Sequence, residues 1–132
     1  MGDLNKLEVW KLSLELAQNV YFLTNHGKIM KDYSLKDQMR RAAVSIPSNI
    51  AEGVESGYDS LGVRFFNIAK GSAAELKTQI ILADRIGYIE TRDCLSLLEN
   101  IETIGRKLNK LISYRKSVIN SKTNPNRLKP DA

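Results

Sequence analysis

The side chains best suited to chemistry gather in the segment SIPSNIAEG at positions 45–53. Its polar members are Ser45, Ser48, Asn49 and Glu52. A serine nucleophile needs a neighbouring general base and oxyanion donors. The chain has one histidine, His26, and lacks the GxSxG motif that presents a nucleophilic serine on a strand–helix turn. We therefore expect a protein that is not an enzyme and has no catalytic residue.

The same segment also reads as the interior of a helix interrupted by a proline. Pro47 lacks a backbone N–H and crowds the carbonyl of Ala43. Serine hydroxyls can bond the carbonyls that a kink frees, while Asn49 and Glu52 are spaced to bond a neighbouring helix. We expect a proline-kinked helix whose own polar residues satisfy the backbone groups that the kink frees.

Neither a metal nor a cofactor is expected. One cysteine and one histidine cannot build a metal-ligand cluster, and Cys94 falls in an apolar stripe, as a buried small hydrophobe would. The start of the chain lacks the basic and apolar regions of a signal peptide, and no apolar run reaches membrane-spanning length. These features favour a cytoplasmic protein with no membrane partner.

Apolar residues recur at helical spacing in four segments, and no strand pattern or internal repeat accompanies them. The first segment covers 7–23 and ends at NHGK, with Gly27 as its cap. The second begins at Ser34, with Asp37 as the acid of a capping box, and runs past Pro47. Arg40 and Arg41 are expected to pair with Asp37 and nearby acids.

The third segment covers 60–86 and ends at Gly87, and the fourth begins with Thr91 as its N-cap. Arg115 is the one charged residue in the apolar stripe of the fourth segment. The expected fold is all-α, an antiparallel up-down-up-down four-helix bundle over residues 1–119, with a disordered basic tail at 120–132. Wide apolar faces on the first and third segments predict self-association.

Charge is distributed unevenly along the chain, whose net charge is +5. Residues 1–104 hold 12 Lys and Arg against 14 Asp and Glu, whereas residues 105–132 hold eight against the single Asp131. A basic end of this kind is typical of proteins that bind phosphates. The alternative is an ordinary solvated helix face near a helix C-terminus. The candidate nucleic-acid-binding residues are Arg106, Lys107, Lys110, Arg115 and Lys116.

Four segments of the sequence also resemble those of a known protein family. SIPSNIAEG, together with LEVWKLSLELAQNVYFLT, YSLKDQMRRAA and FFNIAKGSAAELKTQIILA, resembles the 23S rRNA intervening-sequence proteins over residues 4–115. The resemblance implies a four-helix bundle that assembles into a ring, a homopentamer, with no established catalytic residues. It also marks five positions as structural members of the family signature: Ser45, Pro47, Asn49, Glu52 and Gly53. Genes of this family are often found in insertions of large-subunit rRNA genes. Relatives include the accessory variability proteins of diversity-generating retroelements, which bind nucleic acid and a reverse transcriptase.

Two functions remain open from the sequence. The first is an accessory protein whose ring presents a basic surface to structured RNA or DNA, or to a ribonucleoprotein. The alternative is a protein-interaction scaffold whose basic face docks an acidic partner without a nucleic-acid role. Binding that weakens steeply with salt favours the first, and a specific protein partner favours the second.

Overall fold

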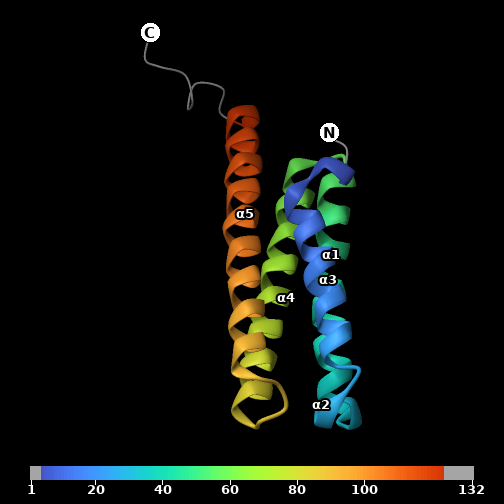
Figure 1. Cartoon of the computed structure of the whole chain (residues 1–132). Helices are drawn as coiled ribbons and strands as arrows, with labels where there is room; N and C mark the ends of the chain where they lie inside the picture. Colours follow the sequence, from blue (N-terminus) through green and yellow to red (C-terminus); the bar gives the residue numbers. More distant parts are fainter. Residues whose placement is uncertain (1–3, 124–132) are drawn as a thin grey trace.

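The computed structural model describes residues 4–123. These residues form a short 3₁₀ helix and five α-helices, without a strand. In chain order the elements are η1 (Leu4–Lys6), α1 (Glu8–Leu23), α2 (Gly27–Lys31), α3 (Tyr33–Glu55), α4 (Asp59–Arg85) and α5 (Thr91–Thr123). The four long helices alternate in direction and form a bundle (Figure 1), which confirms the all-α class.

The helices of the bundle do not pack equally. α3 packs most extensively against α4, and α4 against α5, whereas the contact between α1 and α5 is short. Fully buried side chains from each long helix form one core: Leu16, Met39, Ile46, Ile50, Phe66, Leu76, Ile80, Ile104 and Leu108. The seam between α1 and α5 is therefore the least filled side of the bundle. None of the helices in the described part of the chain is long and apolar enough to span a membrane.

The end of α1 differs from the expectation that Gly27 caps this helix. α1 ends at Leu23, and Thr24 follows it as the C-cap, with its hydroxyl donating to the carbonyl of Val20 at 2.8 Å. Gly27 has a φ of +72° but begins the additional helix α2 instead of ending α1. The buried hydroxyl of Thr24 already satisfies a carbonyl at the helix end, so no glycine is needed there.

The start of α3 corrects the prediction of a cap at Ser34 with Asp37. Asp32 is the N-cap, and its Oδ1 accepts a hydrogen bond from the backbone N–H of Leu35 at 3.1 Å. Its Oδ2 accepts a second bond from the hydroxyl of Tyr88 at 3.2 Å. This bond, followed by desolvation and the negative charge of Asp32, raises the pKa of Tyr88 above its ordinary value.

α3 continues as one α-helix through Pro47, whose side chain is buried. At the other end of the molecule, the predicted stop of α4 at Gly87 is confirmed. Gly87 has a φ of +78° and donates to the carbonyl of Asp84, while Tyr88 donates to that of Ala83 at 2.8 Å. These two bonds form a Schellman motif, in which glycine takes the left-handed position.

α5 is longer than expected. It begins at Thr91, whose hydroxyl donates to Asp84 Oδ1 at 2.8 Å and so links the start of α5 to the end of α4. The helix continues to Thr123, so the expected boundary at Ile119 lies inside it and residues 120–123 are helical. The remainder of the expected tail, 124–132, lies outside the described residues.

Candidate nucleic-acid interface

The segment at 45–53 joins α3 to α4. The hydroxyls of Ser45 and Ser72 are 2.8 Å apart and form a hydrogen bond between the two helices. Asn49 Nδ2 donates back to the carbonyl of Ser45 at 2.8 Å and to its hydroxyl at 3.0 Å. The expectation that Asn49 bonds a neighbouring helix is therefore wrong, since Ser45 makes that contact and Asn49 supports it from the next turn.

Gly53 allows α3 and α4 to approach each other closely. A Cβ added at Gly53 would lie 2.5 Å from Cε1 of Phe66, a fully buried ring. A Cβ at Gly62 would lie 3.1 Å from the carbonyl oxygen of Gly53. Ser48 and Glu52 are exposed. Ser45 and Gly53 thus lie at the contact between α3 and α4, and Pro47 between them is buried.

Two of the five candidate basic residues pair with acids on the surface. Arg106 donates to Glu102 on its own helix at 3.1 Å, and both side chains are exposed. Lys107 lies 3.3 Å from Glu8 and links α5 to the start of α1. Exposed pairs of this kind contribute little to stability and exchange readily with other charges.

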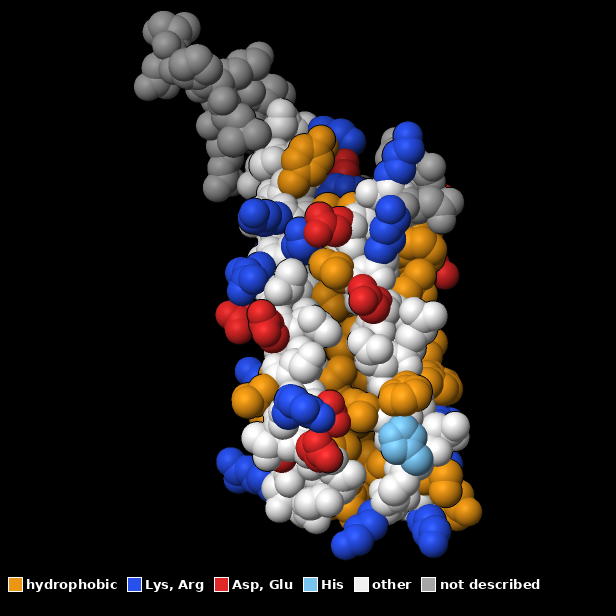
Figure 2. Space-filling view, in the orientation of Figure 1, with side chains coloured by type: hydrophobic (Ala, Val, Ile, Leu, Met, Phe, Trp, Pro, Cys, Tyr) orange, Lys and Arg blue, Asp and Glu red, His pale blue; other side chains and the backbone are white. Residues whose placement is uncertain are grey.

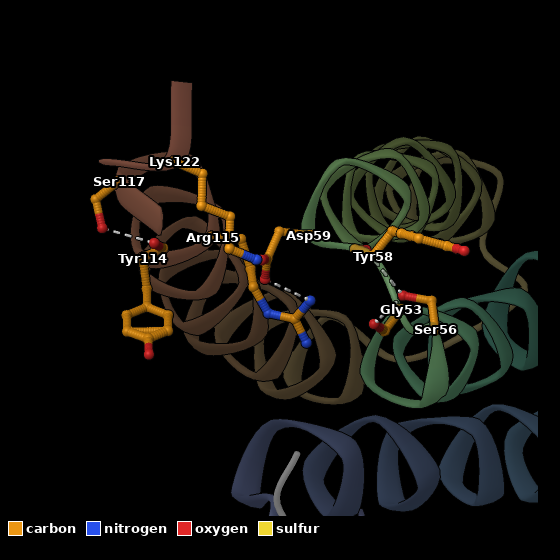
Figure 3. Close-up of polar contacts among 8 residues, drawn as sticks. All are labelled: Gly53, Ser56, Tyr58, Asp59, Tyr114, Arg115, Ser117 and Lys122. Carbon is orange, nitrogen blue, oxygen red and sulfur yellow. Dashed lines mark hydrogen bonds and ion pairs between the residues drawn. The ribbon is translucent and has the colours of Figure 1, made fainter. Parts of the chain in front are cut away.

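Arg115 is not a surface cation. Its Nη1 donates to Asp59 Oδ1 at 3.2 Å, and the two side chains are 12% and 20% exposed. The guanidinium also lies 5.6 Å from the ring centroid of Phe66. Lys122 contacts the second oxygen of Asp59 at 3.1 Å, so one carboxylate holds two cations of α5 (Figure 3). The assignment of Arg115 to a phosphate-binding surface is corrected: it pins α5 to the start of α4.

Lys110 and Lys116 are exposed and form no ion pair with any residue among 4–123. They lie within the basic segment of α5, which we define as residues 105–123. This segment has no Asp or Glu and carries Arg106, Lys107, Lys110, Arg115, Lys116 and Lys122. In Figure 2, Lys and Arg side chains follow α5 and gather at the end of the bundle where this helix finishes.

The expected ion pair between Arg40 and Asp37 is also corrected. Arg40 Nε donates to the hydroxyl of Thr24 at 2.9 Å, and its guanidinium lies 4.4 Å from the ring centroid of Tyr21. The side chain therefore ties α3 to the end of α1, and it forms no ion pair with Asp37 within the described part of the chain. The buried hydroxyl of Thr24 thus accepts a hydrogen bond from Arg40, and the ring of Tyr21 supplies a cation–π contact in place of a carboxylate.

A pocket beside the basic segment of α5 was not anticipated from the sequence. We call it the end pocket; it has a volume of about 640 Å³ and lies where η1, α3, α4 and α5 meet. Its rim includes Lys6, Asp59 and Tyr114. A tyrosine within a run of basic residues is the sequence signal that could have indicated Tyr114. Lys6 and Asp59 come close to Tyr114 only in the tertiary fold, so no sequence signal indicates them.

Cys94 is buried, with 3% of its surface exposed, as expected for a small core residue. Burial raises the pKa of its thiol, and the neighbouring Asp84 raises it further by its charge and by a hydrogen bond. Among residues 4–123 no group of three or more His, Cys, Asp or Glu side chains is placed to hold a metal ion.

The chain was compared with known families and structures. The family model of the 23S rRNA-intervening sequence proteins matches residues 5–110. A crystal structure of a protein with unknown function from the S23 ribosomal protein family of Bacteroides thetaiotaomicron is 27% identical, with a TM-score of 0.72. The alignment covers 79% of this chain and 97% of that one. No curated protein matches. With the family model spanning most of its length, the chain belongs to the 23S rRNA-intervening sequence protein family.

Proposed function

We propose that this chain is a non-enzymatic accessory protein that binds structured nucleic acid through the basic segment of α5. The observation that carries the proposal is the charge of this segment, which has six cations and no acid. Ion pairs engage four of the six, with Glu102, Glu8 and Asp59, so six positive charges face three negative ones. A surplus of this kind attracts phosphates without reading base sequence.

The exposed residues within the segment are suited to this role. Lys110 and Lys116 are solvent-exposed, and Arg106 can exchange Glu102 for a phosphate because its pair is open to water. No helix-turn-helix or RNA-recognition motif is apparent in the sequence, so we expect recognition by shape and charge. The name of the matching family, which refers to 23S rRNA, supports RNA as the first class of ligand to test.

The proposal includes assembly of several copies into a ring, for which the resemblance suggests a homopentamer. Four large apolar side chains on one face of α4 and its C-cap are between 37% and 48% exposed: Leu61, Ile68, Leu82 and Ile86. Nothing within the described part of the chain covers this face, and contact with a second copy would remove it from water. A ring would repeat the basic segment and increase affinity through avidity.

A bend of α3 at Pro47 is part of the same proposal. The proline ring crowds the preceding turn and removes one backbone hydrogen bond, which favours bending of the helix. A bent α3 would shape the surface that each copy offers to its neighbours.

The test is fluorescence anisotropy of labelled structured RNA and duplex DNA at several salt concentrations. The variant Lys110→Glu/Lys116→Glu is compared with Lys70→Glu/Lys77→Glu, which changes the same charge at exposed positions of α4. We expect wild-type binding at physiological salt, and a salt dependence whose slope falls by about two in the α5 variant only. Each protein's oligomeric state is measured by light scattering, so that loss of avidity is not mistaken for loss of contacts.

Two results would contradict the proposal. One is an equal loss of nucleic-acid affinity in both variants, which would show that binding depends on the net charge of the protein and not on α5. The other is wild-type binding that vanishes well below physiological salt, which would direct the search to an acidic protein partner.

A further inference from the structure

The end pocket has apolar walls at the tip of the least filled seam of the bundle. Its apolar lining comes from three helices and the residue before α1: Leu7, Val54, Phe66, Leu111, Tyr114 and Val118. A volume of about 640 Å³ falls in the range typical of small-molecule sites, which is roughly 300–1,000 Å³. In Figure 2 apolar side chains are visible along the seam between α1 and α5. The pocket is thus large enough and apolar enough to bury a planar group.

Positive charge surrounds this pocket. Lys6 and Arg115 line it, and among residues 4–123 the only lining acid is Asp59, whose two oxygens already contact Arg115 and Lys122. Two cations and one carboxylate thus line the pocket, and Lys122 adds a third cation beside that carboxylate. An apolar cavity with a positive rim fits a ligand that joins a planar apolar group to negative charge.

Tyr114 supplies a stacking surface at the rim. Its side chain is 63% exposed, and Figure 3 shows the ring projecting from α5 away from the side chain of Arg115, toward the side on which α1 lies. Lys110 precedes it by one helical turn and so lies on the same face of α5. An aromatic ring flanked by lysines is the arrangement with which proteins stack unpaired bases and neutralise their phosphates.

The apolar surface continues past the end pocket along the seam. A second hollow of about 250 Å³ shares Leu7 and Leu111 with the end pocket. Its charged lining consists of Glu8, Lys107 and Lys110, and Lys107 forms an ion pair with Glu8. Cations thus border both hollows on the α5 side. A strand that leaves the end pocket along this seam would keep its backbone near positive charge.

We infer that the end pocket receives an unpaired base of bound RNA, which stacks on Tyr114 while Lys6, Lys110 and Lys122 neutralise the neighbouring phosphates. This inference rests on the proposed function and makes it more specific, because a charge-led surface alone would bind unpaired RNA no more tightly than paired RNA. A nucleotide fits the pocket better than an acidic side chain does, since Asp and Glu have no aromatic ring that could stack on Tyr114.

The test uses two RNAs of equal length and charge: a hairpin with 2-aminopurine in its unpaired loop, and a blunt duplex with 2-aminopurine in a base pair. We expect tighter binding of the hairpin, with quenching of its loop fluorophore on binding. Tyr114→Ala should weaken hairpin binding about tenfold or more and leave duplex binding unchanged. Tyr114→Phe, which keeps the ring, should bind within about twofold of the wild type.

Tyr33→Ala is the matched control, because Tyr33 is 70% exposed, has Lys36 beside its ring at 4.7 Å and starts α3, far from the end of α5. Circular dichroism checks that each variant is folded. Equal binding of both RNAs, or hairpin binding that survives Tyr114→Ala, would overturn the pocket inference and leave the proposed function standing. Failure of the wild type to bind either RNA at physiological salt would overturn both.

Discussion

Arg115 and Asp59 lie 56 positions apart, and Arg115 Nη1 donates a hydrogen bond to Asp59 Oδ1 at 3.2 Å. Both side chains are largely buried, at 12% and 20% exposure, and Phe66 lies beneath the guanidinium. The pair fixes the C-terminal half of α5 against the first turn of α4. It thereby holds one wall of the end pocket and the neighbouring basic segment in position.

Removing one member of this pair should destabilise the fold. We expect Asp59→Asn to lower the free energy of unfolding by about 2 kcal/mol, because a charged hydrogen bond is lost and Arg115 stays largely buried. Arg106→Gln is the comparison, since its pair with Glu102 is exposed and should contribute less than about 0.5 kcal/mol. Urea denaturation monitored by circular dichroism measures both, and equal losses would show that the buried pair has no special role.

Much of the bundle was predictable because apolar periodicity marks which side of each helix faces the core. Arg115 shows where that reading stops. The sequence places Arg115 in the apolar stripe of α5, yet its charge led to its assignment to the nucleic-acid-binding residues. Its partner Asp59 begins α4, and no local pattern connects the two positions. Long-range pairs depend on how helices meet in space, which local spacing does not encode.

Two glycine substitutions should change the stability of the protein in opposite directions, because only one of the two glycines lies where α3 approaches α4 closely. Gly53→Ala would place a Cβ 2.5 Å from Phe66, and overpacking of this kind costs about 1–3 kcal/mol. Gly71→Ala meets no atom within 4 Å in the middle of α4, and the gain in helix propensity should stabilise the protein by about 0.5–1 kcal/mol. Thermal unfolding compares the two variants under the same conditions.

Phe66→Leu tests the cause of the first effect. If the ring of Phe66 is what excludes a side chain at position 53, the smaller residue should recover part of the stability lost in Gly53→Ala. Strictly additive losses in the double variant would place the strain elsewhere.

The bond between Tyr88 and Asp32 predicts a dependence of stability on alkaline pH. The folded state raises the pKa of Tyr88, so above about pH 10 the unfolded chain loses the phenolic proton while the folded chain still keeps it. The free energy of unfolding should therefore fall as the pH rises through this window. Urea titrations at pH 9, 10 and 11 should show a smaller decrease for Tyr88→Phe, and parallel curves would contradict the linkage.

The same contact explains why one helix end was predictable and another was not. Gly87 marks the end of α4 because a left-handed position favours glycine, which is a local property of the backbone. Asp32 caps α3 in place of Ser34 and also accepts a bond from Tyr88, which follows α4. Several polar residues near position 34 could cap a helix, and in the structure the capping residue is the one that also holds this tertiary bond.

The hydroxyls of Ser45 and Ser72 predict an asymmetric double-mutant cycle. Ser72→Ala removes the bond between α3 and α4 but leaves Ser45 Oγ with the amide of Asn49 at 3.0 Å. Ser45→Ala removes both bonds of that hydroxyl and should cost more, with a coupling energy of about 0.5–1.5 kcal/mol between the two serines. Ser117→Ala is the control, because within residues 4–123 its exposed hydroxyl bonds only the carbonyl of Tyr114 on its own helix. The loss of this bond should change stability by less than about 0.5 kcal/mol. If the losses of stability in Ser45→Ala and Ser72→Ala simply add in the double variant, the hydrogen bond between the two serines does not stabilise the contact of α3 with α4.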